Sequence, residues 1–167
     1  DRAKKYMQEL SDVLEDSSYL FIERNKQAYC IHAVKGSYFI QDATTHIGDV
    51  LPMNCGGAPL AMLAHMEPAR QSEIIESLSL DEEQNQSLIR RLEVIRKNGY
   101  SYSHNEVKPG TAAVGVPVFN HEGMVVAALS MGGIESRFTG ERLAKIVELV
   151  KNAAYRLSRE IGWDDKT

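Results

Sequence analysis

The sequence predicts an α+β fold, in which one antiparallel sheet is backed by helices from both ends of the chain. Strand-like runs occur in two groups whose members are joined by short turns, and a helical stretch separates the groups. An amphipathic helical pattern occupies each end of the chain. A parallel, doubly wound sheet is disfavoured because the C-terminal strands are joined by a turn too short for a crossover helix.

The N-terminal part predicts one helix followed by a hairpin. Residues 1–16 place apolar side chains on one stripe and charged side chains on the other. Residues 18–24 and 28–34 are rich in strand-forming residues and flank a short polar loop, which is typical of two paired strands. A further short strand is predicted over residues 38–40.

The middle of the chain is predicted to be helical over residues 59–66, residues 67–76 and a longer segment that ends at Asn98. Ser79 and Glu82 match the capping-box pattern at the start of that longer helix. Gly99 follows its last turn, where glycine commonly ends a helix.

The C-terminal part returns to strands and then to a helix. Residues 100–106 alternate weakly, whereas residues 111–119 and 124–131 predict a hairpin with a four-residue turn. A last helix is predicted from Thr139 to Gly162, since its apolar stripe is unbroken.

This C-terminal hairpin has one bulky and one small-residue face. The bulky face comprises Ala112, Val114, Val116 and Val118 with Val125, Ala127, Leu129 and Met131; the small face comprises Thr111, Ala113, Gly115 and Pro117 with Val126, Ala128, Ser130 and Gly132. Small side chains leave room either for a ligand cavity or for a closely packed helix, and both readings stay open. Pro117 inside a strand predicts a sheet edge or a bulge.

A glycine pair precedes the first predicted middle helix. Gly56 and Gly57 allow close approach of the backbone, and the amides of Gly57 and Ala58 would point outward at the positive end of the helix dipole. Such a pair of amides suits a carboxylate. The alternative is an ordinary loop, because glycine punctuates many loops.

Composition and charge exclude several classes of protein. The 167 residues carry a net charge of −4, which argues against nucleic-acid binding by this chain alone. No apolar run reaches the roughly 18 residues of a membrane span, and no signal-peptide core opens the chain, so a cytoplasmic location is expected. Because the sequence begins at Asp1, we expect a piece of a longer protein.

The sequence gives little support for catalysis or for metal binding. The two cysteines, Cys30 and Cys55, are expected to be free thiols, although one disulfide is compatible with the sequence. Cys30 and His32, joined by His46 or Cys55, are a conceivable metal set, but zinc-type spacing is absent. The sequence also lacks nucleophile-elbow, P-loop and dinucleotide motifs, so we expect no catalytic residue, no metal and no cofactor.

Several segments together resemble one family. The runs Gly48–Ala64, Ile95–Tyr100, Pro117–Asn120 and Val126–Gly133 resemble, in order, sequence blocks of the IclR-type transcriptional regulators. Glu106 and Gly110 match single positions between these blocks, and the match covers nearly the whole chain.

The resemblance implies the C-terminal effector-binding domain of such a regulator, with a GAF-like (profilin-like) fold. It implies that residues 1–167 form one domain, that residues 1–16 end a linker helix, and that a winged helix-turn-helix domain before this segment contacts DNA. It also implies a homodimer or homotetramer and, as effector, a small organic acid or an aromatic catabolite.

Carried over by position, the resemblance implies one effector pocket. Its residues are Ala43, Leu51, Met53, Gly57, Ala58, Ser103, Thr111, Ala113, Ser130 and Gly132. Family members often have an acidic residue at the position of Ser103, some have cysteine at that of Ala113, and serine occurs at that of Gly132. Because these groups are smaller or less polar here, we predict a somewhat larger or more apolar acid.

Two other functions stay open at this point. One is a GAF-like redox enzyme that uses Cys55, since a helix N-terminus can lower the pKa of a thiol. The other is a dimerisation module without a ligand.

Overall fold

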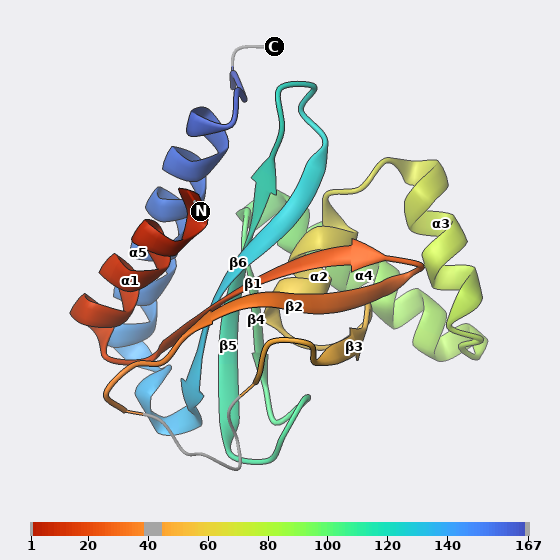
Figure 1. The fold of residues 1–167 in the computed structure, drawn as a ribbon. Helices are drawn as coiled ribbons and strands as arrows, with labels where there is room; N and C mark the ends of the chain where they lie inside the picture. The colour runs from red at the N-terminus through yellow and green to blue at the C-terminus, as the bar shows by residue number, and fades with distance from the viewer. Residues whose placement is uncertain (1, 39–44, 166–167) are drawn as a thin grey trace.

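Six antiparallel strands form one sheet within residues 2–38 and 45–165, which are the residues that the computed structural model describes. Their order across the sheet is β3-β2-β1-β6-β5-β4 (Figure 1). The strands are β1 (Ser17–Arg24), β2 (Gln27–Val34), β3 (Val50–Pro52), β4 (Ser101–His104), β5 (Thr111–Phe119) and β6 (Val125–Ile134).

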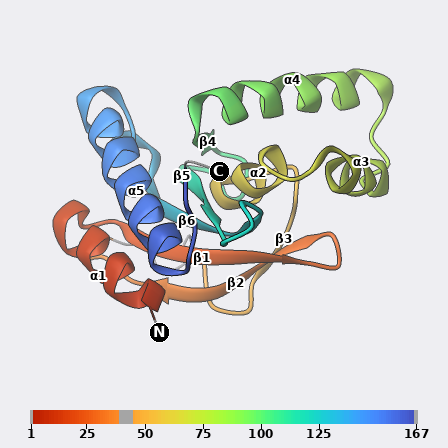
Figure 2. The same cartoon turned by 90° about the horizontal axis from the view of Figure 1, so that it is seen from above.

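Helices cover both faces of the sheet. Figure 2 shows α1 (Arg2–Leu14) and α5 (Gly140–Glu160) side by side on one face, and α2 (Gly57–Ala64), α3 (Pro68–Ser77) and α4 (Glu82–Asn98) on the other. A short 3-10 helix, η2 (Glu135–Arg137), joins β6 to α5. The described helices include none that is long and apolar enough to span a membrane.

Each face of the sheet has its own apolar core. The bulky side chains of β5 pack with α1 and α5, as Val114 at 0% exposure and Met7 at 0% illustrate. The second core lies between the sheet and α2, α3 and α4, where Leu60, Leu63 and Ile74 are fully buried. The predicted α+β class, with terminal helices behind one sheet, is confirmed.

The two predicted hairpins exist, and each contains a bulge. In the second, Val118 pairs with Ala127 while Phe119 pairs with Val125, so Val126 is an extra residue in β6. The bulge turns Val125 to the opposite core from Ala127, and its predicted place on the bulky face was therefore wrong. Simple alternation carries no information about such an inserted residue.

The capping box of α4 lies two residues later than predicted. Asp81 accepts a hydrogen bond from the amide of Gln84 at 2.8 Å, and the Asp81 amide donates to Gln84 Oε1 at 3.1 Å. Ser79 has a φ of 53°, which closes the turn after α3 and prevents it from acting as an N-cap. Gly99 ends α4 in the left-handed region, as predicted.

One strand was missed, and two other strand predictions had different outcomes. β3 was not predicted, because three residues leave no periodic signal. Of the strand predicted over 38–40, Phe39 and Ile40 lie outside the described residues, and Tyr38 forms a bend. Pro117 lies beyond the last pair of β4 with β5, Ser101 with Gly115, so it occupies a local edge as expected.

His65, at the C-terminal cap of α2, predicts an acid-sensitive step in stability. Its Nδ1–H donates to the Ala61 carbonyl at 2.8 Å, and its ring packs edge-on against Phe119. Burial lowers the pKa of His65 below its usual value. The stabilisation is therefore complete above the unfolded pKa of about 6.5 and declines as the pH falls toward the folded pKa, by at most about 1.4 kcal/mol per pH unit.

The test compares His65→Gln with the parent chain by urea unfolding at pH 7.5, 6.5 and 5.5. The parent is expected to lose more stability between pH 7.5 and 5.5 than the variant does. His121→Gln is the control, because the His121 side chain is 71% exposed. Parallel pH profiles for the parent and His65→Gln would show that His65 does not contribute this step.

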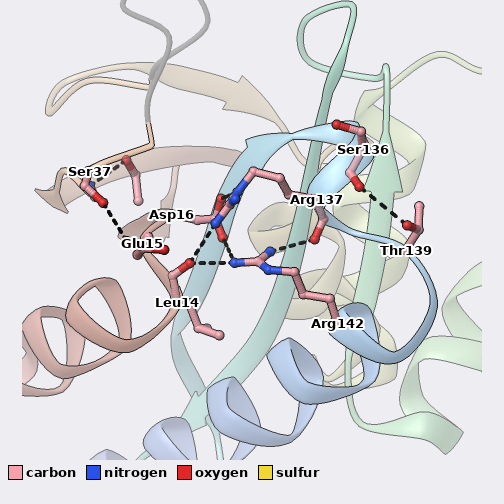
Figure 3. A network of polar contacts seen from close by, with 10 residues as sticks. Leu14, Glu15, Asp16, Ser37, Ser136, Arg137, Thr139 and Arg142 are labelled. Carbon is pink, nitrogen blue, oxygen red and sulfur yellow. Dashed lines mark hydrogen bonds and ion pairs between the residues drawn. The ribbon is translucent and has the colours of Figure 1, made fainter.

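A buried acid ties the end of α1 to the start of α5. Asp16 is 0% exposed, and its carboxylate accepts hydrogen bonds from Arg137 Nε at 2.9 Å and from an Arg142 guanidinium nitrogen at 2.6 Å. Both arginines also donate to the Leu14 carbonyl (Figure 3). Asp16, Arg137, Arg142 and the Leu14 carbonyl are called the Asp16 cluster below.

Candidate functional site

A cavity of about 50 Å³ lies between the N-terminus of α2 and the small-residue face of the sheet. Its wall combines residues from β1, β3, α2, β4, β5 and β6 with the segment that follows β4. The described lining comprises Tyr19, Phe21, Thr45, Leu51, Gly56, Gly57, Ala58, Pro59, Ser103, Glu106, Val107, Thr111, Ala112, Ala113, Ser130, Gly132 and Gly133.

Two residues in the first turn of α2 line this cavity, and their backbone amides have no acceptor among the described residues. The helix begins at Gly57, two residues earlier than predicted, so Gly57 and Ala58 occupy its first turn. Gly56 precedes them with a φ of 89°, a conformation that glycine adopts easily. Neither amide donates a hydrogen bond to any described residue. First-turn amides at the positive end of a helix dipole favour an anion.

The small strand residues do serve close packing at one end of the cavity. A Cβ atom on Gly115 would lie 2.2 Å from the Gly57 carbonyl oxygen and 2.7 Å from the Ala58 nitrogen. The Ser101 hydroxyl donates to the same Gly57 carbonyl and fixes the start of α2 against β4. Ser130, on the neighbouring strand, lines the cavity instead. The small face therefore packs closely against α2 at Gly115 and borders a cavity at Ser130, and a ligand in that cavity stays a prediction.

Two serine hydroxyls that line the cavity make no hydrogen bond within the described part of the chain. Ser103 and Ser130 are each 3% exposed, and neither side chain makes a hydrogen bond to a described residue. Their oxygens remain open to the cavity that they line. Thr111 differs, because its hydroxyl already donates to the Lys108 carbonyl at 2.6 Å. Because both oxygens border the cavity and bond to no described residue, they are available to a hydrogen-bonding ligand or to water.

A neutralised acid closes one side of the cavity. The Glu106 carboxylate accepts two hydrogen bonds from Arg91, at 2.6 and 3.1 Å, and a longer one of 3.4 Å from the Gly56 amide. Arg91 also donates to the Tyr102 carbonyl at 3.0 Å. The ion pair holds the segment after β4 against α2 and α4, and it cancels the negative charge beside the amide pair.

An aromatic ring occupies the space that a larger residue at position 132 would need. A Cβ atom on Gly132 would lie 3.2 Å from Cε2 of Tyr19. Tyr19 is 6% exposed, and burial raises the pKa of its hydroxyl. With Phe21, Leu51 and Val107 it contributes apolar surface to the cavity lining.

The structure brings together eight of the ten predicted effector residues. Leu51, Gly57, Ala58, Ser103, Thr111, Ala113, Ser130 and Gly132 all line the cavity. Met53 instead lies in the second apolar core at 0% exposure, and Ala43 lies outside the described residues. Sequence reasoning did not identify Tyr19, Phe21, Thr45, Gly133 and Val107, and it used Glu106 only as a family position.

The geometry around the cysteines does not favour thiol chemistry. Both cysteines are free. Burial, and then the nearby charge of Glu106, raise the pKa of the Cys55 thiol, which does not support the redox alternative, since that alternative needs a lowered thiol pKa. Burial raises the pKa of Cys30 to about 12. The described residues contain no group of three His, Cys, Asp or Glu side chains arranged to hold a metal ion.

Comparison with known proteins identifies related regulators. Residues 1–159 match the family model described as the bacterial transcriptional regulator IclR C-terminal domain. The chain is 31% identical over 167 residues to the HTH-type transcriptional regulator KipR of Bacillus subtilis, covering 96% of this chain and 66% of that protein. It is 26% identical over 165 residues to KdgR of Escherichia coli, covering 95% and 62%. The chain thus spans about two thirds of the length of these relatives.

Solved structures share the fold. The Thermotoga maritima IclR structure superimposes with a TM-score of 0.89 at 25% identity, covering 98% of this chain and 68% of that one. The C-terminal domain of Escherichia coli KdgR gives a TM-score of 0.83 at 25% identity, covering 97% of both chains. The predicted GAF-like fold is thereby confirmed. The chain belongs to the IclR family of bacterial transcriptional regulators and corresponds to their C-terminal domain.

Proposed function

We propose that this domain senses a small organic acid in the cavity at the N-terminus of α2 and thereby modulates DNA binding by a helix-turn-helix domain of the full-length regulator. The observation that supports this most strongly is the convergence of unpaired donors: the Gly57 and Ala58 amides and the Ser103 and Ser130 hydroxyls line one cavity. The carboxylate would accept from the amides, and the hydroxyls would bind a neutral polar group.

The charge of the lining favours an acid with a single carboxylate. Among the described lining residues Glu106 alone carries a full charge at neutral pH, and Arg91 neutralises it. The amide pair at the helix N-terminus favours about one negative charge. A second carboxylate on the ligand would meet no cation in the lining and would approach Glu106, which disfavours a dicarboxylate.

The volume of the cavity limits the size of the acid that it can bind. About 50 Å³ accommodates a few water molecules or a short acid, and the Tyr19 ring occupies the space beside Gly132. The apolar lining supports the more apolar acid that the sequence predicts, whereas the volume favours a short one. We therefore propose a short monocarboxylate with an apolar part.

Thermal melting against acetate, pyruvate, benzoate and succinate tests the proposal. A ligand at one hundred times its Kd stabilises the fold by about 2.7 kcal/mol, which raises the Tm of a chain of this size by about 5–10 °C. We expect a shift with at least one monocarboxylate and a smaller one with succinate. No shift with any monocarboxylate at high concentration would contradict the proposal.

The double variant Ser103→Ala and Ser130→Ala separates a binding role from a structural one. Because neither hydroxyl has a protein partner, its removal is expected to change the free energy of unfolding by less than about 0.5 kcal/mol. Binding of the acid is expected to weaken about tenfold or more, since each lost hydrogen bond to a polar or charged ligand group contributes about 0.5–3 kcal/mol. Calorimetry and urea unfolding measure the two effects.

Ser18→Ala is the matched control. Ser18 is also buried, at 0% exposure, but its hydroxyl donates to the Met7 carbonyl at 2.8 Å and accepts from Ser11. Its loss is expected to cost about 1–3 kcal/mol of stability and to leave acid binding unchanged. The reverse pattern, with a destabilised double variant that still binds acid, would show that Ser103 and Ser130 act in folding alone.

The assembly and the DNA-binding role belong to the same proposal. The relatives are named HTH-type regulators, and this chain covers about two thirds of their length, so we propose that DNA is contacted by the remaining part of the full-length protein. We further propose a homodimer or homotetramer. Gel filtration with and without pyruvate distinguishes a ligand-responsive assembly from a module that only dimerises.

A further inference from the structure

The Asp16 cluster lies directly behind the wall of the cavity. Gly132 and Gly133 of β6 line the cavity, and Gly132 pairs with Ser17, the residue after Asp16. A Cβ atom on Gly133 would lie 2.8 Å from Asp16 Oδ1 and 3.1 Å from the Phe138 ring. One backbone segment thus faces the cavity and also packs against the buried carboxylate with no room for a methyl group.

The same carboxylate organises the end of α1. The Leu14 carbonyl, at the last residue of α1, accepts hydrogen bonds from both Arg137 and Arg142. Arg142 also donates to the Arg137 carbonyl at 2.6 Å, which joins η2 to the first turn of α5. Figure 3 shows the two guanidinium groups converging on Asp16, Arg137 from η2 and Arg142 from the start of α5. The end of α1, the cavity wall and the start of α5 therefore meet at one carboxylate.

We propose that the Asp16 cluster couples occupancy of the cavity to the order of the C-terminal end of α1. The inference rests on the proposed acid-binding function of the cavity. An acid against β6 holds Gly132 and Gly133 in place, and Gly133 in turn holds Asp16 against its arginines. Binding therefore orders the last turn of α1, the helix that we expect to lead toward the DNA-binding domain.

Thermodynamic linkage makes the effects of the acid and of the Asp16 cluster on each other equal. If the acid stabilises the cluster, then weakening the cluster must weaken binding of the acid by the same factor. Arg142→Gln removes one of the two arginines and leaves the pairing of Arg137 with Asp16 at 2.9 Å, so the fold is expected to survive. Coupling free energies between sites commonly correspond to factors of 5–150, and we expect the Kd for pyruvate to rise about tenfold.

The control is Arg156→Gln on the same helix. Arg156 pairs with Glu9 of α1 at 3.5 Å and lies over the Tyr6 ring, so it also joins α5 to α1, but away from Asp16. Its replacement is expected to leave the Kd for pyruvate unchanged.

Hydrogen exchange at the Glu15 amide measures how a bound acid affects the C-terminal end of α1. The Glu15 amide donates to the Ser11 carbonyl at 2.9 Å and closes the last turn of α1. Saturating pyruvate is expected to slow its exchange about tenfold in the parent chain and in Arg156→Gln, but less than twofold in Arg142→Gln. Gly133→Ala, which displaces Asp16 from the cavity side, is expected to speed this exchange without any ligand.

The outcomes separate the two proposals. Pyruvate binding of equal strength in the parent and in Arg142→Gln, with unchanged exchange at Glu15, overturns the coupling and leaves the acid site intact. A parent chain that binds no pyruvate contradicts pyruvate as the bound acid and overturns the coupling as stated for it. Unchanged Glu15 exchange in Gly133→Ala also overturns the coupling.

Discussion

Replacing Asp16 by alanine is expected to lower the free energy of unfolding by about 3–5 kcal/mol, which is a large fraction of the stability of an ordinary domain. The carboxylate is fully buried and accepts hydrogen bonds from two arginines whose side chains are only 19% and 30% exposed. Its removal leaves both guanidinium groups close together without their counter-ion. Urea unfolding of the two chains measures the difference.

Asp12→Ala is the control for the loss of an acidic residue in the same region. Among the described residues, Asp12 accepts a hydrogen bond only from the exposed Gln8 side chain, at 2.8 Å, so its replacement is expected to change stability by less than about 0.5 kcal/mol. A loss below about 1 kcal/mol in Asp16→Ala would mean that the cluster contributes little to the fold.

Replacing Gly115 by alanine is expected to cost about 3 kcal/mol and to abolish acid binding. The new Cβ atom would lie 2.2 Å from the Gly57 carbonyl oxygen, and the atoms it meets are backbone rather than a flexible side chain. The start of α2 must therefore move away from β5, which displaces the amides of Gly57 and Ala58 from the cavity. Urea unfolding and calorimetry with pyruvate measure the two losses.

Gly123→Ala separates this clash from the general effect of replacing glycine. Gly123 has a φ of 76°, and a Cβ atom there would meet nothing within 4 Å. Its replacement is expected to cost about 1 kcal/mol, from the left-handed conformation alone, and to leave acid binding intact. Equal losses in the two variants would show that the contact between α2 and β5 is not tight.

Local pattern was sufficient to predict most elements of the fold. Hairpin spacing identified β1 with β2 and β5 with β6, apolar periodicity identified α1 and α5, and capping signals identified α4. The errors concern features without a periodic signal. Asp81 rather than Ser79 caps α4 because Ser79 adopts a left-handed conformation, which depends on how the preceding helix ends.

The candidate site was predictable only where its residues belong to local motifs. The glycine pair at the start of α2 and the small residues of β5 and β6 are visible in the sequence, and they supply the two amides, Thr111 and Ser130 of the lining. Tyr19 enters the cavity because β1 pairs with β6, Ser130 lying opposite it, and no local pattern reveals this long-range pairing. The contact between Gly133 and Asp16 depends on the same pairing.

The amide signals of Gly57 and Ala58 in a ¹H–¹⁵N spectrum, recorded during a titration with pyruvate, test the acid site most directly. A carboxylate bound as proposed shifts both signals downfield in a saturable manner, and the signals of Ser103 and Ser130 move with the same apparent Kd. Signals at α2 that stay fixed while pyruvate binds elsewhere, or that fail to move at any concentration, would contradict it.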